Sequence, residues 1–100
     1  MKAIALGWEE SEAGWGTRPD GISIHTTSEE CDRFVKAYND SLPDEVQHEY
    51  ERPTTGNKIK VTICDELAKC ITGDKQSCRL YRGSYTVETT VDKEVIITLK

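Results

Sequence analysis

Short stretches of the chain alternate hydrophobic and polar residues with period two, the pattern of β-strands that bury one face. The stretches with this pattern are residues 2–8, 21–26, 58–64, 84–91 and 94–100, with residues 76–82 as a further short candidate. Asp92 and Lys93 join the last two regular stretches, which predicts a C-terminal hairpin. The alternation therefore predicts a mostly antiparallel sheet of five or six strands.

The first two strands are separated by a polar segment, residues 9–20, that we predict to be a long loop. It ends on Pro19-Asp20-Gly21, in which proline presets the backbone for a turn and glycine tolerates a positive φ. In the strand that follows, alternation makes Ile22 and Ile24 inward, and Ser23 and His25 outward. Residues 2–26 are thus predicted to form a hairpin whose loop is a candidate for function.

One segment repeats its apolar residues with helical spacing. The stripe consists of Cys31, Phe34, Val35, Tyr38 and Leu42. Thr27 can cap the N-terminus of this helix, Glu30 completes a capping box, and Pro43 ends it. We predict a helix over residues 28–42 that covers one face of the sheet.

The remaining segments are assigned from their prolines and glycines, which interrupt regular structure, and from their apolar residues. Residues 43–57 contain two prolines and few large apolar residues, which predicts a long connection with at most a short helical turn. Residues 65–71 favour a short helix over an irregular continuation of the preceding strand. In that strand the inward positions are Ile59, Val61 and Ile63. The predicted fold class is α+β, a mostly antiparallel sheet with one main amphipathic helix on one face, in a single domain of residues 1–100.

The charge of the chain is negative overall and unevenly distributed. The formal net charge is −5. Residues 1–54 carry 5 Lys or Arg against 12 Asp or Glu, whereas residues 55–100 carry 8 against 6. An acidic chain is a poor general binder of duplex DNA, because phosphates dominate that affinity. A small anionic ligand in a local basic pocket, or a basic protein partner, remains compatible with the composition.

Four cysteines occur at irregular spacings and none belongs to a C-x-x-C motif. Both histidines are distant from them in sequence, so we expect no metal site. The sequence shows no secretory segment and no apolar run long enough to span a membrane. We therefore expect a soluble, cytoplasmic protein with four reduced thiols.

The polar segment before the second strand is the first candidate site. It combines Trp15, Gly16 and Arg18, which offer a stacking face, a close backbone approach and a guanidinium fork suited to phosphate. The spacing is not G-x-G-x-x-G, so a dinucleotide site is not supported. The alternative is structural, with glycines that make turns and tryptophans that cap the core.

The second candidate is a basic cluster near residue 80. Lys75 and Arg82 flank Arg79 and Tyr81, and the last two share one face of a strand. Basic residues with an interleaved tyrosine suit recognition of a phosphate and a base. The alternative is a solvated edge strand whose charge prevents unwanted pairing.

The acidic segment 44–53 is the third candidate, because His48 and its glutamates are residue types that catalyse proton transfer. No nucleophile motif, metal motif or carboxylate pair accompanies them, so a solvated face is the simpler interpretation. His25, predicted to face outward, is interpreted as a surface or interface residue. We expect no catalytic residues and no enzyme.

Two strings, G-W-G-T-R-P-D-G-I-S-I-H at residues 14–25 and D-E-V-Q-H-E-Y-E-R-P at residues 44–53, resemble parts of phage-encoded Thoeris anti-defence proteins. The resemblance covers the first half of the chain. It implies a bacteriophage protein that evades immunity by sequestering cyclic ADP-ribose signals made by bacterial TIR enzymes, and some members also bind cyclic oligonucleotides. It further implies a homo-oligomer that holds its ligand in pockets between or beside subunits without cleaving it.

The leading hypothesis is therefore cyclic nucleotide binding, as a sponge without cofactors. Trp15 or Tyr81 would stack on a base, and His25 would donate or accept a hydrogen bond. Phosphate donors would be Arg18, Arg52, Arg79 and Arg82. The alternative is an acidic inhibitor, similar in action to anti-CRISPR proteins, that blocks a nucleic-acid-binding defence protein with its negative N-terminal half. A small scaffold protein without a ligand is the third possibility.

Overall fold

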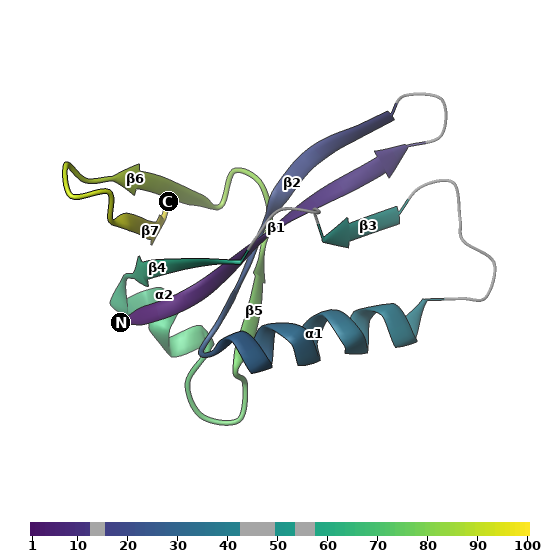
Figure 1. Cartoon of the computed structure of the whole chain (residues 1–100), viewed down its shortest axis with the longest axis horizontal. Coiled ribbons are helices and arrows are strands. Elements are labelled where there is room, and N and C mark those ends of the chain that lie inside the picture. The colour runs from purple at the N-terminus through teal and green to yellow at the C-terminus, as the bar shows by residue number, and fades with distance from the viewer. Residues whose placement is uncertain (13–15, 43–49, 54–57) are drawn as a thin grey trace.

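The computed structural model describes residues 1–12, 16–42, 50–53 and 58–100, which form seven strands and two helices (Figure 1). The elements are β1 (Lys2–Glu12), β2 (Gly16–His25), α1 (Ser28–Ser41), β3 (Tyr50–Pro53), β4 (Ile59–Ile63), α2 (Asp65–Cys70), β5 (Ser77–Leu80), β6 (Tyr85–Thr89) and β7 (Val95–Leu99). One main helix and one short helix accompany a sheet of mostly antiparallel strands. The predicted α+β class is confirmed.

Among the described residues, six strands follow one another in the order β5-β2-β1-β4-β7-β6, and β3 adds to β1. The β4–β7 pair is parallel and the other pairs are antiparallel. β4 pairs with residues 2–5 of β1, and β3 pairs with residues 8–11 of the same strand. Since β2 occupies the opposite edge of β1, the outer half of the β1–β2 hairpin becomes a three-stranded arm.

This arm corrects the predicted loop at residues 9–20. Residues 9–12 and 16–20 belong to β1 and β2, and Glu10 lies directly opposite Arg18. The arm extends past the core and is polar, so it lacks the alternation that marks a strand in sequence. The pairing steps from Gly7 opposite Ile22 to Glu9 opposite Pro19, which places a bulge on β2 where a turn was predicted.

Helix α1 begins where the sequence predicts. The Thr27 side chain accepts a hydrogen bond of 3.2 Å from the backbone N–H of Glu30, whose carboxylate pairs with Arg33. Phe34 and Tyr38 meet the indole of Trp8 edge-on, with ring centroids 5.9 and 4.9 Å apart. The apolar stripe therefore covers one face of the sheet, as predicted.

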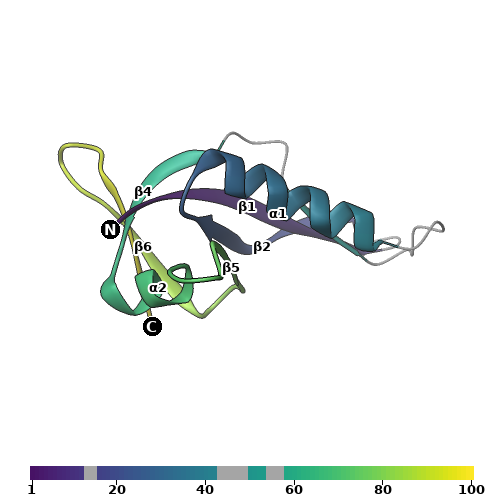
Figure 2. The ribbon, with the colours of Figure 1, turned by 90° about the horizontal axis from the view of Figure 1, so that it is seen from below.

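The sheet is covered on both faces near β1 and β2, with α1 on one side and α2 on the other (Figure 2). On the α2 side Ile24, Leu67, Ile71 and Ile97 are at most 1% exposed and form one core. The outward prediction for Ser23 and His25 is wrong, because both are fully buried, His25 against Phe34 of α1 and Ser23 against Trp8. Alternation separates the two faces of a strand, but it does not tell which face is covered.

Several further predictions fall on the second half of the chain. Val61 and Ile63 are buried as predicted, whereas Ile59 at the start of β4 is 48% exposed, against prediction. The predicted connection over residues 43–57 contains the strand β3, and its residues 43–49 and 54–57 lie outside the described residues. The short helix α2 and the β6–β7 hairpin are confirmed. In the turn of that hairpin Lys93 has a φ of 65°.

Candidate functional site

The predicted ligand residues lie in separate parts of the fold. Gly16 and Arg18 belong to the arm, and Arg52 lies in β3 with its Cα opposite that of Glu9. Trp15, like His48, lies outside the described residues. The remaining predicted residues are His25, Arg79, Tyr81 and Arg82, and they lie in or after β2 and β5. The structure therefore brings part of the predicted set together and leaves the arm apart.

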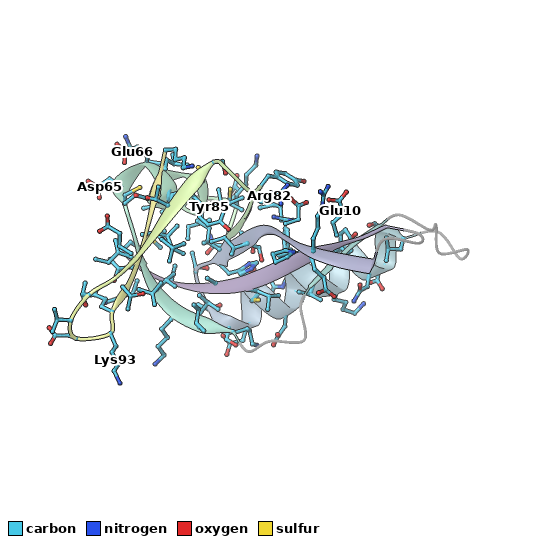
Figure 3. All side chains as sticks on the ribbon, turned by 90° about the horizontal axis from the view of Figure 1, so that it is seen from above. Glu10, Asp65, Glu66, Arg82, Tyr85 and Lys93 are labelled. Atoms are coloured by element: carbon cyan, nitrogen blue, oxygen red, sulfur yellow. The ribbon has the colours of Figure 1, made fainter. Side chains whose placement is uncertain are left out.

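Arg18 is engaged by a carboxylate of the neighbouring strand. Its Nε and Nη2 both donate to Oε2 of Glu10, at 3.1 and 3.0 Å. About half of the Arg18 side chain is exposed, and Glu10 lies on the outer arm (Figure 3). An anion that approaches Arg18 would have to compete with Glu10.

Arg79, in contrast, is nearly buried and ties β5 to the bulge of β2. Its Nη1 donates to the carbonyl oxygens of Leu80 at 2.7 Å and Ile22 at 3.2 Å. Its Nη2 donates to the carbonyl oxygen of Asp20 at 2.6 Å, and the Asp20 carboxylate lies 3.8 Å away. The guanidinium carbon lies 4.5 Å from the ring centroid of Tyr81, which confirms that Arg79 and Tyr81 share a face.

The bulge requires glycine beside Arg79. Gly21 has a φ of +87°, and a Cβ at this position would lie 2.0 Å from the carbonyl oxygen of Leu80 and 2.9 Å from Nη1 of Arg79. Both the backbone conformation and the space exclude a larger residue. The sequence identified Gly21 as a turn residue and gave no sign of this close approach.

A chain of hydrogen bonds runs beneath α1. The indole Nε1 of Trp8 donates to Ser23 Oγ at 2.8 Å, Ser23 Oγ lies 2.7 Å from Nε2 of His25, and Nδ1 of His25 lies 2.7 Å from Ser77 Oγ. The indole can only donate, so Ser23 Oγ accepts from it. The Ser23 hydroxyl can either donate to Nε2 or accept from it, and the tautomer of His25 sets the direction of the bonds to Ser23 and Ser77.

This environment keeps His25 neutral. Burial lowers the pKa of His25 from 6.5 to about 4, with nearby Lys58 lowering it further and Asp32 opposing the shift. The ring is fully buried, and the ring of Phe34 in α1 lies 5.2 Å away between centroids. In this structure His25 presents no surface to a ligand and instead links α1, β2 and β5.

A cavity of about 660 Å³ opens beside β5, in the size range of small-molecule sites. It lies between the end of α2, the turn that follows and the edge of β5 that does not face β2. Its lining consists of Lys69, Cys70, Thr72, Asp74, Lys75, Ser77, Cys78 and Arg79. Three cationic residues thus contribute to the lining against one carboxylate, and one of them, Arg79, directs its guanidinium to backbone carbonyl oxygens.

The cavity contains part of the predicted basic cluster and extends it. Lys75 and Arg79 belong to that cluster, whereas Lys69 in α2 was not predicted as a site residue. Within the described part of the chain, neither Lys69 nor Lys75 forms an ion pair. Arg82 lies outside the cavity lining, in the exposed turn between β5 and β6 (Figure 3). The cavity therefore combines Arg79 with two lysines that have no ion-pair partner among the described residues, a suitable setting for an anion.

A second hollow of about 410 Å³ lies near the start of α1 and is lined in part by Lys2 and Lys60. Lys2 is already engaged there, because its Nζ donates to Thr62 at 2.9 Å and to Glu94 at 2.8 Å. Because Lys2 is engaged, only Lys60 is left to bind an anion in this hollow, whereas both Lys69 and Lys75 are available in the cavity beside β5.

Comparison of the chain with protein-family models, curated proteins and solved structures finds no match. In the described ranges, no three His, Cys, Asp or Glu side chains group as metal ligands would. No helix in the same ranges has both the length and the apolar character needed to cross a membrane.

Proposed function

We propose that the protein binds a small phosphorylated ligand of the cyclic nucleotide class in the cavity beside β5, and holds it without cleaving it. The resemblance of residues 14–25 and 44–53 to phage-encoded Thoeris anti-defence proteins gives this binding a role. In that role the protein is a homo-oligomer that sequesters an immune signal in the cytoplasm of the host cell.

The observation that carries the proposal is the charge of the cavity. Lys69, Lys75 and Arg79 line it in a chain whose net charge is −5. Phosphate oxygens are favoured by such a local excess of positive charge, whatever the charge of the whole chain. Arg79 is held rigidly by its carbonyl partners, whereas the two exposed lysines are free to adjust to a ligand.

A stacking surface lies against Arg79, one of the residues that line the cavity. Tyr81 is 55% exposed and packs its ring on the Arg79 guanidinium. One side of the ring is therefore fixed, while the residue retains surface for a base to contact. Stacking of a base on an aromatic ring typically contributes about 1–3 kcal/mol.

The environment of His25 supports binding without cleavage. Ser77 lines the cavity and contacts His25, an arrangement that superficially resembles a nucleophile and its base. A pKa of about 4, however, makes His25 a weak base near neutral pH.

The proposal is tested by ligand release. Purified protein is incubated with a panel of cyclic ADP-ribose isomers and cyclic dinucleotides, passed over a desalting column and denatured by heat. We expect one compound of the panel to be recovered chemically intact from the denatured protein, with none in an albumin control. Recovery of a cleaved product, or of no compound at all, would contradict the proposal.

A further inference from the structure

The outer strand of the C-terminal hairpin leaves one edge of the sheet open. β6 ends the strand order, and β7 is the one strand of the described residues that pairs with it (Figure 1). The register of this pair runs without a shift from Tyr85 opposite Leu99 to Thr89 opposite Val95. The other edge of β6 is therefore an uninterrupted row of backbone groups that no described strand binds.

The hydrogen bonds at the two ends of the hairpin show which backbone groups form this row. The N–H of Thr90 donates to the carbonyl oxygen of Glu94 at 2.9 Å, and that of Lys100 donates to the carbonyl oxygen of Ser84 at 3.1 Å. Bonded and non-bonded residues alternate along an antiparallel pair, so the even-numbered residues of β6 bond to β7. The residues whose N–H and C=O groups point away from β7 are Tyr85, Val87 and Thr89.

This edge lacks the features that usually prevent strands from pairing between molecules. Such features are lysines, prolines and bulges on the edge strand. Residues 84–91 contain no proline, and Glu88 is their one charged residue. Val87 is 53% exposed, although it lies opposite the buried Ile97 in the hairpin. An edge that is regular, almost uncharged and partly apolar favours the addition of a further strand.

We infer that β6 pairs antiparallel with β6 of a second copy of this chain, so that one sheet continues across the two-fold axis of a dimer. Charge selects the register, because centring the pair on Glu88 would place two carboxylates directly opposite each other. Centring it on Val87 places this side chain against the partner subunit's Val87, and Glu88 opposite the partner subunit's Thr86. The outward row is symmetric about Val87, so each outward N–H and C=O group meets a group that can bond to it.

The interface specifies the homo-oligomer of the proposed function, and in that respect it rests on that proposal. The lining of the cavity beside β5 contains no residue of β6. The dimer therefore forms without a ligand, and its test needs none. Because the paired edge is short, we expect a dimer that dissociates on dilution.

The test combines sedimentation with amide hydrogen exchange by NMR on the full chain, over a series of protein concentrations and without nucleotide. We expect the mass to rise with concentration from that of the monomer to twice that value. Over the same series, exchange should slow several-fold at the outward amides of Tyr85, Val87 and Thr89. The amides of Thr86 and Glu88 already bond to β7, so their exchange should change little.

Two variants block the edge in different ways. Val87→Lys places two positive charges opposite each other, and Thr89→Pro removes one outward N–H without removing a bond to β7. Both should stay monomeric where the wild type is dimeric, with the circular dichroism of the wild type. Ile59→Lys is the matched control, because Ile59 is 48% exposed in β4, away from β6, and this variant should dimerise.

Three results would overturn the inference. They are a wild type that is monomeric at every concentration, a folded Val87→Lys or Thr89→Pro variant that still dimerises, and a dimer in which the outward amides of β6 gain no protection. Each of these leaves the ligand-release experiment, which requires no dimer, to decide nucleotide binding by itself.

Discussion

The guanidinium group of Arg79 lies over the indole ring of Trp8, 5.1 Å from its centroid. Trp8 is 1% exposed and also contacts Phe34 and Tyr38 of α1 and the hydroxyl of Ser23. Trp8 therefore contacts residues of three elements: the edge strand β5, the strand β2 and the helix α1. Arg79, which lines the cavity, is therefore attached to an aromatic residue that is almost completely buried.

Arg79→Lys should lower the stability of the fold even without a ligand. A lysine cannot reproduce the fork that reaches the carbonyl oxygens of Asp20, Ile22 and Leu80. We expect the free energy of unfolding to fall by about 1–3 kcal/mol, measured by urea denaturation. Arg82→Lys is the control, and an equal effect of the two changes would contradict the anchoring role of Arg79.

Gly21→Ala should destabilise the protein more than Gly73→Ala. Both glycines have a positive φ, +87° and +80°, so alanine is strained at either position. Only at Gly21 does the new Cβ meet the Leu80 backbone, whereas nothing lies within 4 Å of it at Gly73. We expect a cost of about 1 kcal/mol at Gly73 and at least ~3 kcal/mol at Gly21. Equal melting temperatures for the two variants would contradict the close approach.

Acidification should destabilise the protein through His25. Its pKa is about 4 in the folded protein and 6.5 when unperturbed, so the unfolded chain binds the proton first as the pH falls. The stability contributed by neutral His25 is complete above pH 6.5 and is lost between pH 6.5 and 4. From pH 7 to pH 5 we expect a loss of about 2 kcal/mol.

The matched measurement uses His25→Gln, which retains a polar side chain but cannot titrate. The pH range from 7 to 5 is chosen because ordinary carboxylates titrate below it. The unfolding free energy of the variant should be lower at pH 7 and nearly constant over this range. A slope equal to that of the wild type would show that another group titrates.

Phe34→Ala should remove contacts with both Trp8 and His25, which lie 5.9 and 5.2 Å from the Phe34 ring. Full truncation of a buried phenylalanine costs about 3–5 kcal/mol. Because Phe34 is only half-buried, we expect about 2–3 kcal/mol in thermal or urea unfolding. Lys36→Ala on the exposed face of α1 is the control, and an equal effect would mean that Phe34 does not support the core.

The regular elements could be predicted because their sequence signals are local. Thr27 and the apolar stripe define α1, and alternation around Asp92 and Lys93 defines the β6–β7 hairpin. The arm could not be predicted, since Glu10 opposite Arg18 and the added strand β3 depend on pairing between distant segments. Pairing of this kind leaves no periodic pattern in a polar strand.

The site was predictable only in part, for a related reason. Arg79 and Tyr81 are two residues apart, so strand periodicity places them on one face. Lys69 joins Lys75 only because the chain turns back between α2 and β5. His25 was assigned to the outer surface because it is polar, but its hydrogen bonds to Ser23 and Ser77 allow it to be buried.

The most direct test of the central claim is a calorimetric titration of the ligand recovered in the release experiment. Lys69→Gln and Lys75→Gln each remove one positive charge from the cavity, and Lys93→Gln removes one from the β6–β7 turn, away from the cavity (Figure 3). We predict that each cavity variant binds about tenfold more weakly, while Lys93→Gln binds like the wild type. Equal affinity in all three variants and the wild type would contradict a phosphate site beside β5.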